Sequence, residues 1–368
     1  MSPLFYISLF LLSIVVIRFL IALLNYLTRP VLPSGKVEGN PLVSVLIPAR
    51  NEEKNISEIL NCLSKQDYSN IEVLVYNDQS TDATAQIVED RAKHDERIRL
   101  IEGVELPEDW LGKNHACYQL AQRAKGNFYL FLDADVKVSQ QFIRNATAYM
   151  QRKRLTLLSM FPRQEMVTWG ERLVIPNMNW ILLSLLFLRL VRWSKRRSLA
   201  AANGQMMMFS VANYDENQWH EKLKSSSVED IGISRLVKRK KLRMATLLGT
   251  DDISCRMYNS YSESIAGFSK NVTEFFGGSV FTTILFTLIS TFSPILIILS
   301  LPFPLTLLYF FSMVSSRMLI SSLSEQSPYL NVILWPAQHL SFLHLVYKAI
   351  RFKNGEKLSW KGREINSI

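Results

Sequence analysis

Cysteine is scarce in this chain of 368 residues, which has only Cys62, Cys117 and Cys255. The three lie far apart and form no C-x-x-C pair, so the sequence argues against a disulfide framework and against a cysteine-based zinc site. This scarcity fits a protein that faces a reducing compartment such as the cytosol.

Acidic residues are also in the minority, with 32 Asp and Glu against 42 Lys and Arg and a formal net charge of +10. Such an excess is typical of proteins that bind nucleic acid or anionic lipid, and of membrane proteins with basic cytosolic loops. The length allows one large core and an accessory region. The positions of the apolar and acidic residues along the chain distinguish among these classes of protein.

The first apolar tract, residues 4–27, carries only one charge, Arg18, and is long enough to span a bilayer. No basic residue precedes it, whereas Arg29 and Lys36 follow. We therefore expect a retained transmembrane anchor over 1–28 rather than a cleaved signal peptide. The positive-inside rule then places the following chain in the cytosol, as in a protein of the cell (inner) membrane.

A second apolar tract, 280–323, is about twice the length of one span, and Pro302 and Pro304 lie in its middle. It predicts a transmembrane hairpin that turns at these prolines. Arg317 would then lie near the returning end, where its long side chain can snorkel to the interface.

Two weaker segments are expected at the membrane surface. A helix over about 173–193 ends in basic residues beside Trp and Leu, which is typical of an interfacial helix, although a buried core helix fits its length equally well. Residues 328–368 predict an interfacial or membrane helix followed by a basic cytosolic tail beside anionic lipid. Together the tracts indicate a multi-pass protein with three full spans.

Between these tracts, strand and helix patterns alternate. Strands are expected at 42–47 (ending at Pro48), 71–76, 97–101 and 128–132, with helices at 52–65, 82–93 and 114–124. This alternation predicts an α/β fold with a mostly parallel sheet and helices on both faces. Ligands of such folds bind beyond the carboxyl ends of the strands.

Polar residues follow three of the expected strands, and parallel strands would bring them to one edge. They are Arg50, Asn51 and Glu52, then Asn77, Asp78, Ser80 and Asp82, then Asp133 and Asp135. A turn with a helix cap at Ser80 or Thr81 would explain the second cluster alone. Asp133 and Asp135, however, end a buried strand and need a compensating charge. A divalent cation that also holds phosphate supplies it, which indicates a nucleotide-handling enzyme.

Four motifs in order make the chain resemble family 2 glycosyltransferases with a GT-A nucleotide-sugar domain. They are residues 45–52 (VLIPARNE), 77–82 (NDQSTD), 133–135 (DAD) and 229–230 (ED). The resemblance covers about 41–270 and implies a GT-A fold, Rossmann-like, with transmembrane helices at both ends of the chain. The membrane tracts are similar to those of carotenoid, hopanoid and ceramide glycosylating enzymes.

The resemblance also implies a nucleotide-sugar site. In the family Asp78 would bind the base, and Pro48, Arg50 and Glu52 would line the nucleoside pocket. Asp133 would lie near the ribose and the metal.

Asp135 would ligate Mg²⁺ or Mn²⁺, which bridges the diphosphate and stabilises the charge that develops on it. Lys113 precedes an expected helix, a placement that favours a phosphate contact over an ordinary solvated lysine.

On the acceptor side, the resemblance makes Asp230 the general base of an inverting transfer. By itself the segment is an ordinary capped helix start with acids in its first turn. Further diphosphate or acceptor contacts are expected at Asn203, Gly204, Gln205, Glu229, Arg256 and Lys270.

One departure from the family concerns processivity. Processive members carry Q-x-x-R-W after the base motif, and this sequence has none there. The similar run at 189–193 (RLVRW) precedes Asp230 and lacks the Gln. We therefore expect transfer of a single sugar, and the analogy with the ceramide enzymes is weakened.

The expected activity is transfer of one hexose, from UDP-glucose, to the hydroxyl or carboxyl of a membrane lipid. One alternative is a polyprenyl phosphate acceptor, which needs no strong base. Another is a basic membrane-anchored binding protein without catalysis, whose cationic tail binds lipid or nucleic acid in a salt-sensitive way. Acids at three strand ends would repel a polyanion, so no nucleic acid partner is expected.

Overall fold

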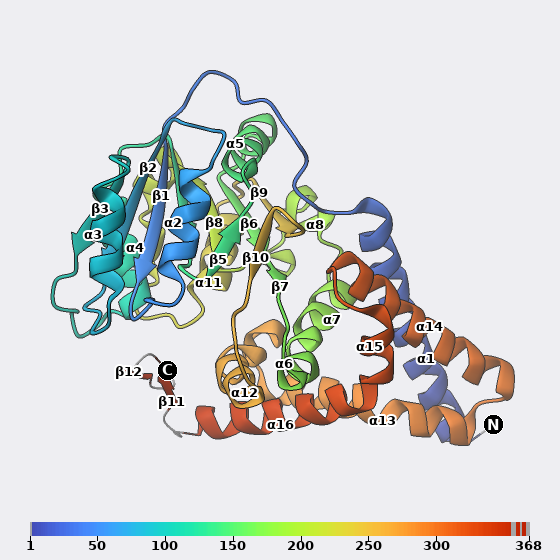
Figure 1. The fold of residues 1–368 in the computed structure, drawn as a ribbon. Helices are drawn as coiled ribbons and strands as arrows, with labels where there is room; N and C mark the ends of the chain where they lie inside the picture. The colour runs from blue at the N-terminus through green and yellow to red at the C-terminus, as the bar shows by residue number, and fades with distance from the viewer. Residues whose placement is uncertain (1, 355–357, 361–362, 366–368) are drawn as a thin grey trace. The chain divides into compact units, whose positions relative to one another are not determined.

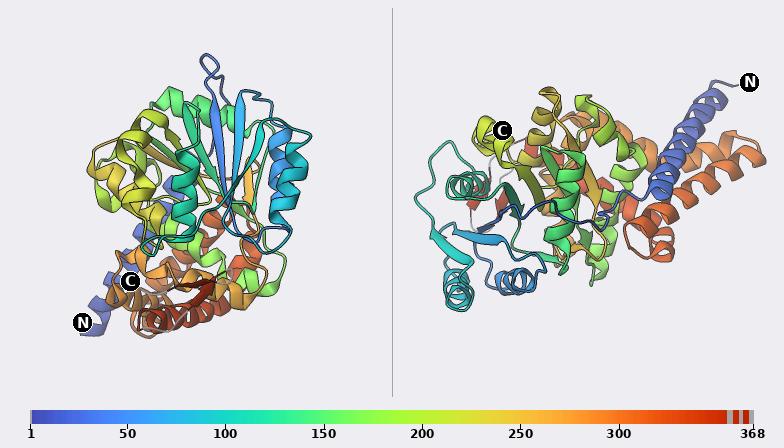
Figure 2. Two further views of the ribbon diagram at one scale, coloured as in Figure 1. Left: turned by 90° about the vertical axis from the view of Figure 1, so that its left-hand side faces the viewer. Right: turned by 90° about the horizontal axis from the view of Figure 1, so that it is seen from above.

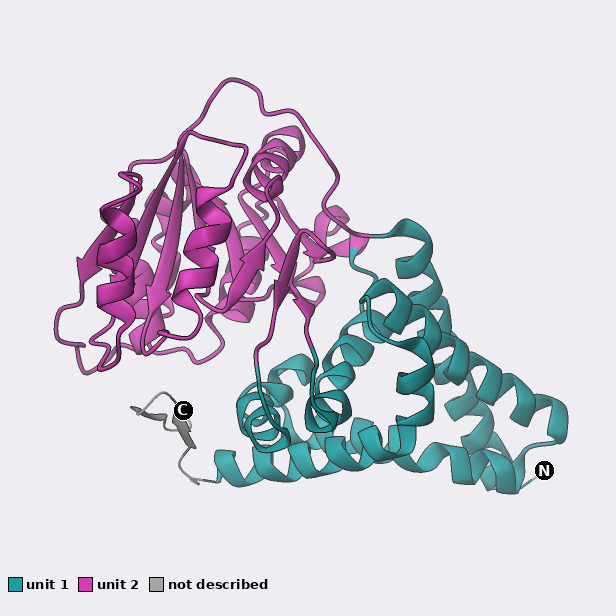
Figure 3. Ribbon diagram, viewed as in Figure 1, with its two compact units in different colours: residues 1–29, 166–188, 258–368 teal, residues 30–165, 189–257 magenta. Residues whose placement is uncertain are grey.

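The computed structural model describes residues 2–354, 358–360 and 363–365, and the chain divides into two compact units. Figure 3 colours them separately. The helical unit comprises 1–29, 166–188 and 258–368, and the sheet unit comprises 30–165 and 189–257. The cytosolic domain expected over 41–270 therefore differs from the sheet unit, because 166–188 and 258–270 belong to the helical unit.

The sheet unit is built on a seven-stranded sheet (Figure 1). In spatial order its strands are β3 (Ile98–Glu102), β2 (Ile71–Asn77), β1 (Val43–Ala49), β4 (Phe128–Leu132), β8 (Met206–Ser210), β6 (Leu157–Phe161) and β9 (Met244–Leu248). All neighbouring pairs are parallel except the two that involve β8. A smaller sheet contains β5 (Val136–Val138), β10 (Ile253–Cys255) and β7 (Arg163–Gln164).

Helices flank both faces of the large sheet (Figures 1 and 2). They are α2 (Ile56–Ser64), α3 (Thr84–Ala92), α4 (Gly112–Ala121), α5 (Phe142–Lys153), α8 (Arg189–Trp193), η1 (Arg197–Leu199), α9 (Val211–Asn217), α10 (Trp219–Lys222) and α11 (Glu229–Arg239). Fully buried Val45 and Ile47 of β1 pack in one core with Ile59 of α2. Burial of this apolar area is the main force that holds the layers together. The α/β prediction is confirmed.

Pro48 does not end the first strand, which continues to Ala49. It pairs with Tyr76 of β2 but lies beyond Leu46, the last residue of β1 that pairs with β4. The missing N–H of Pro48 therefore removes no hydrogen bond to β4.

The reversed strand β8 brings a further loop to the functional edge of the sheet. Because β8 is antiparallel to β4, its first residue, Met206, pairs with Leu132 at the carboxyl end of β4. The residues just before Met206 therefore lie beside Asp133, whose N–H donates to Gln205 O over 3.1 Å.

The helical unit contains three helices that are long and apolar enough to cross a membrane: α1 (Pro3–Thr28), α13 (Val280–Ser300) and α14 (Phe303–Leu323). Between α13 and α14 the chain turns at Leu301 and Pro302, both extended. These two helices and their turn lie where the sequence predicts a transmembrane hairpin. The unit also contains α6 (Trp169–Val174), α7 (Pro176–Leu185), α12 (Tyr261–Ser269), η2 (Val272–Phe276), α15 (Pro328–Ile333), α16 (Trp335–Lys353), β11 (Leu358–Trp360) and β12 (Arg363–Ile365).

Two expectations about this part of the chain are wrong. Residues 173–193 do not form one helix, because α6, α7 and α8 are separate and Leu186 is extended. Ile181 and Leu183 of α7 are buried, as in the core-helix alternative. Arg317 does not snorkel either: it is 4% exposed and donates to Gln338 Oε1 over 2.7 Å.

Candidate active site

The loops that follow β1 and β2 are joined to each other at the end of the sheet. Ala49 and Asn77 are the last paired residues, and Asp78 N donates to Ala49 O over 2.8 Å. Arg50 Nη1 donates to Asp78 O over 2.6 Å. The sequence-predicted residues Arg50 and Asp78 are therefore held side by side, next to Pro48.

Polar side chains extend this connection. Asn51 has φ of +52°, a left-handed conformation that Asn tolerates, and its Oδ1 accepts from Thr81 N over 2.9 Å. Ser80 Oγ accepts from Asn51 N, and Thr84 Oγ1 accepts from Glu52 N over 2.8 Å. The helix cap considered at Ser80 or Thr81 is wrong, since α3 begins at Thr84 and these residues bind the other loop instead.

Lys113 lies at the centre of a second cluster. Its Nζ is 2.8 Å from Asp133 Oδ1, 3.2 Å from Gly204 O and 3.6 Å from Glu229 Oε1. Lys113 is in the first turn of α4, Asp133 follows β4, and Glu229 begins α11. One ammonium group thus joins three segments that are far apart in the sequence.

Asp230 is held by two backbone amides. Its Oδ2 accepts from Gly204 N over 2.9 Å and its Oδ1 from Ile231 N over 2.7 Å. A Cβ at Gly204 would lie 3.0 Å from Glu229 Oε1 and 3.3 Å from Lys113 Nζ, so a larger residue would be tightly packed against both side chains. Asp230 also lies in the first turn of α11, where the helix dipole favours a negative charge.

Burial and shared charge set the protonation of this cluster. Burial raises the pKa of Glu229 to about 7, against the opposing charge of Lys113. Burial also raises the pKa of Asp230, although its two amide partners and Lys113 oppose the shift. Burial lowers the pKa of Lys113, but the charges of Asp133 and Glu229 outweigh it and raise that pKa above its usual range. The cluster can therefore accept a proton near neutral pH.

Asp135 lies one residue before β5 and beside Cys255. Burial raises the pKa of the Cys255 thiol, and the charge of Asp135 and a hydrogen bond to it raise that pKa further. Gln205 Nε2 lies 2.9 Å from Cys255 Sγ, which connects this pair to the loop before β8. Arg256 follows Cys255 directly, whereas Lys270 belongs to the helical unit.

The acids at this edge fit a divalent cation whose ligands come partly from the protein and partly from a bound substrate. In the described parts of the chain, no three His, Cys, Asp or Glu side chains form a metal-binding group by themselves. Mg²⁺ is commonly held by one or two carboxylates together with substrate phosphates. Asp133 and Asp135, two residues apart at a strand end, are of the residue type that such a site uses.

Sequence reasoning missed the contribution of Asn114. Its Nδ2 lies 2.7, 3.2 and 2.9 Å from the carbonyl oxygens of Leu223, Lys224 and Ser226. These contacts position the loop that leads into α11, and thereby Asp230. No sequence pattern signals this role, because the partners lie about 110 residues away.

Residues 44–214 match the family model described as Glycosyl transferase family 2. Nearly half of the chain is therefore similar to family 2 glycosyltransferases. The match includes Lys113, Asp133, Asp135 and Gly204, but it ends before Asp230. Geometry alone therefore connects Asp230 to the matched segment.

Similar curated proteins share the type of domain. The chain is 27% identical over 239 residues to 4,4'-diaponeurosporenoate glycosyltransferase of Staphylococcus haemolyticus, covering 64% of this chain and 62% of that protein. It is 38% identical over 94 residues to the protein of the same name in Staphylococcus aureus strain USA300, covering 26% and 24%. The matches thus span less than two thirds of these relatives.

A solved structure shares the fold. The mannosyltransferase PcManGT of Pyrobaculum calidifontis, determined with GDP-Man and Mn²⁺, has a TM-score of 0.56, 18% identity and coverage of 93% of this chain and 98% of that one. The likeness shows that the chain shares the GT-A fold of this structure.

The raised pKa of Glu229 makes the stability of the sheet unit depend on pH. The folded protein holds this proton up to about pH 7, whereas the unfolded chain releases it near the ordinary pKa of 4.5. Stability present below pH 4.5 is therefore lost as the pH rises through about 7. We expect Glu229→Gln to remove this loss, which is about 3 kcal/mol at most, and to raise the Tm at pH 8 relative to wild type.

Thermal unfolding in a neutral detergent between pH 5 and 8 measures this effect. Glu216→Gln is the matched control, because the Glu216 side chain is 70% exposed. If the Tm of Glu229→Gln fell with pH as steeply as that of the wild type, Glu229 would not be the source of the pH dependence.

Proposed function

We propose that the protein is a membrane-bound, inverting, non-processive glycosyltransferase. It moves one hexose from a nucleotide-diphosphate sugar, UDP-glucose, to a membrane lipid of carotenoid type. The names of the similar curated proteins support the acceptor class. For a hydroxyl acceptor, the chemistry rests on the position of Asp230, which the amides of Gly204 and Ile231 fix beside the Lys113 cluster.

The donor is bound by the residues at the carboxyl ends of the strands. Asp78 and Glu52, both buried, face the base and nucleoside from the joined loops, with Arg50 and Pro48 beside them. The first turn of α4 presents its amides and Lys113 to a phosphate.

Asp133 and Asp135 would hold Mg²⁺ or Mn²⁺. When bound, the cation neutralises charge on the leaving nucleoside diphosphate. When no cation is bound, the ammonium group of Lys113 keeps Asp133 oriented, since Lys113 Nζ lies 2.8 Å from Asp133 Oδ1.

Asp230 accepts the proton of an acceptor hydroxyl as that oxygen attacks the anomeric carbon. Its raised pKa makes it a stronger base than a surface aspartate. A direct displacement of this kind needs one base and no covalent nucleophile, and it inverts the anomeric configuration. A carboxyl acceptor is already ionised at neutral pH, so it attacks without this base.

The membrane arrangement follows from the three apolar helices α1, α13 and α14. Arg29 and Lys36, after α1, favour a cytosolic glycosyltransferase domain, on the side of the membrane where nucleotide sugars are made. Transfer of a single sugar is proposed because no Q-x-x-R-W run follows Asp230.

Transfer by the purified full-length protein tests the proposal. Donors are UDP-glucose, UDP-N-acetylglucosamine and GDP-mannose, and acceptors are a carotenoid carboxylic acid, a hydroxyl-bearing lipid and a polyprenyl phosphate. We expect mass spectrometry to find the carotenoid acid heavier by one hexose, and only with UDP-glucose. Transfer to polyprenyl phosphate alone would overturn the acceptor class, and products with several hexoses would overturn the single transfer.

Asp135→Asn is expected to raise the concentration of Mg²⁺ or Mn²⁺ needed for half-maximal transfer by about tenfold or more, since even outer-sphere partners of a metal contribute that much. A metal titration of the initial rate measures the shift. Asp251→Asn makes the same change on a side chain that is 94% exposed and should leave the titration unchanged. An unaltered curve for Asp135→Asn would remove this residue from the metal site.

A further inference from the structure

The helical unit holds an arginine deep in its first apolar helix. Arg18 of α1 is 9% exposed. Its Nε and Nη2 donate to Ser184 Oγ over 3.1 and 2.8 Å, and its Nη1 donates to Ser290 Oγ over 3.4 Å. Among the described residues, the hydrogen-bond partners of this guanidinium are therefore neutral hydroxyl groups.

A second buried arginine lies nearby. Arg317 of α14 donates to Gln338 Oε1 over 2.7 Å and contacts His339 Nδ1 at 3.2 Å, and its Nε has no partner among the described residues. Both guanidinium groups stack on the ring of Trp180, Arg18 at 4.1 Å and Arg317 at 5.1 Å from its centroid. Cation–π contacts stabilise the two cations but leave their charge uncompensated.

The surrounding helices supply no counter-charge. The sequences of α1, α7, α13, α14, α15 and α16 contain neither Asp nor Glu. Within the described chain neither Arg18 nor Arg317 forms a salt bridge. A buried cation in an apolar bundle is expensive without an anion, and such residues mark ligand sites in membrane proteins.

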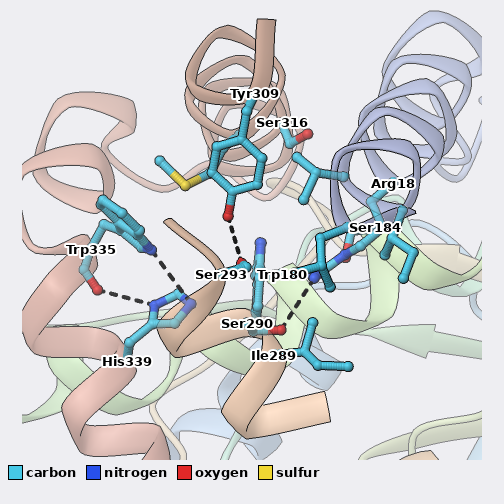
Figure 4. A pocket seen from close by; sticks show the side chains of 14 residues that line it. Arg18, Trp180, Ser184, Ile289, Ser290, Ser293, Tyr309, Ser316, Trp335 and His339 are labelled. Atoms are coloured by element: carbon cyan, nitrogen blue, oxygen red, sulfur yellow. Dashed lines mark hydrogen bonds between the residues drawn. The ribbon is translucent and has the colours of Figure 1, made fainter. Parts of the chain in front are cut away.

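A small cavity, lined by both hydroxyl and apolar groups, opens beside Arg18 (Figure 4). Its volume is about 40 Å³. One water needs about 10–15 Å³ on this measure, so the cavity has room for roughly three heavy atoms. Hydroxyl groups line it, from Ser184, Ser290, Ser293, Tyr309 and Ser316.

The rest of the cavity wall is apolar. Ile14 and Val15 of α1, Ile289 of α13 and Met313 of α14 line it and are only half-buried. Because each of them is partly exposed, apolar surface is available to a lipid chain beside the cavity.

We propose that this cavity binds the carboxylate of a membrane lipid, with Arg18 as its ion-pair partner and the lipid chain along Ile14, Val15 and Ile289. A carboxylate has three heavy atoms, which match the volume of the cavity. Its negative charge would compensate the positive charge of Arg18. The Oγ of Ser290 and the hydroxyl of Tyr309 lie on the same cavity and can donate to its oxygens. This inference concerns binding and does not depend on the proposed transfer reaction.

Three lipids that share the same hydrocarbon chain but differ in head group test the proposal: oleic acid, oleyl phosphate and oleyl alcohol. Their affinity for the full-length protein in nanodiscs is measured at pH 8, with Arg18→Met and Arg18→Lys as variants. Arg351→Met is the matched control, because Arg351 is exposed and stacks on Tyr347 in the same manner.

We expect wild type and Arg351→Met to bind oleic acid more tightly than the alcohol, and Arg18→Met to bind the acid roughly tenfold to a hundredfold more weakly. Since Arg18→Met removes a buried charge that no anion of the described residues compensates, the Tm of the ligand-free variant should be unchanged or higher. Equal affinity of wild type for acid and alcohol, or an undiminished preference in both Arg18 variants, would overturn the proposal. Tighter binding of oleyl phosphate would overturn the choice of a carboxylate.

Discussion

Asp230→Asn is expected to lower kcat for a hydroxyl-bearing lipid by about 10²- to 10⁴-fold, the usual contribution of a general base. The amide keeps the shape of the side chain but cannot take a proton. The same variant should transfer to a lipid carboxylate at nearly the wild-type rate, because that acceptor has no proton to lose. Initial rates with the two acceptors under identical conditions give the ratio directly.

A structural defect would not produce this pattern. Both carboxylate oxygens of Asp230 accept backbone N–H groups, from Gly204 and Ile231, and Asn has only one acceptor oxygen. We therefore expect Asp230→Asn to lose about 1 kcal/mol in free energy of unfolding. This loss would affect the rates with both acceptors equally. Asp251→Asn, on an exposed side chain, serves as the control. Equal loss of rate with hydroxyl and carboxylate acceptors would argue against a base at Asp230.

Lys113→Met should be the most destabilising of the substitutions considered. It removes the cation that lies between Asp133 and Glu229 and leaves buried carboxylates without compensation. Breaking a fully buried pair by removing one partner typically costs about 3–5 kcal/mol. The side chains of Lys113 and Asp133 are 27% and 26% exposed, so we expect a smaller loss that still exceeds that of a surface pair. Glu229 can relieve part of this repulsion by taking a proton, so the loss of Tm should be larger at pH 8 than at pH 5.5.

The control for this variant is Lys93→Met. Lys93 pairs with Asp90 at 2.7 Å, but both side chains are mostly exposed, and such pairs contribute about 0–1 kcal/mol. The double variant Lys113→Met with Glu229→Gln should regain part of the lost stability, since the two residues interact directly. Wild-type Tm for Lys113→Met at pH 8 would show that this lysine does not hold the cluster together.

Local patterns predicted the elements well where one physical rule dominates. The strand at 128–132 was predicted with its observed bounds, because five apolar residues precede an acid. The prolines at 302 and 304 likewise predicted the turn between two apolar helices. The segment 173–193 was mispredicted, since apolar content cannot distinguish an interfacial helix from helices buried in a bundle.

The pairing of charges was not predictable in the same way. Lys113 was expected at a phosphate, and it contacts Asp133, 20 residues away, and the carbonyl of Gly204, 91 residues away. Arg18 was taken as the single charge of an anchor, yet it binds Ser184, 166 residues away. Both contacts depend on which strands and helices become neighbours, and hydrophobic periodicity does not encode that choice.

The sequence by itself determined the alternation of strands and helices, the spans able to cross a membrane, and the acids Asp133 and Asp135 at the end of a buried strand. Only the tertiary structure decided how those acids are compensated. Because β8 runs against β4, Gly204 reaches both Lys113 and Asp230 at the edge where the parallel strands end. A pattern specifies which residues are buried, but only the packed fold sets the distances that decide which buried charges meet.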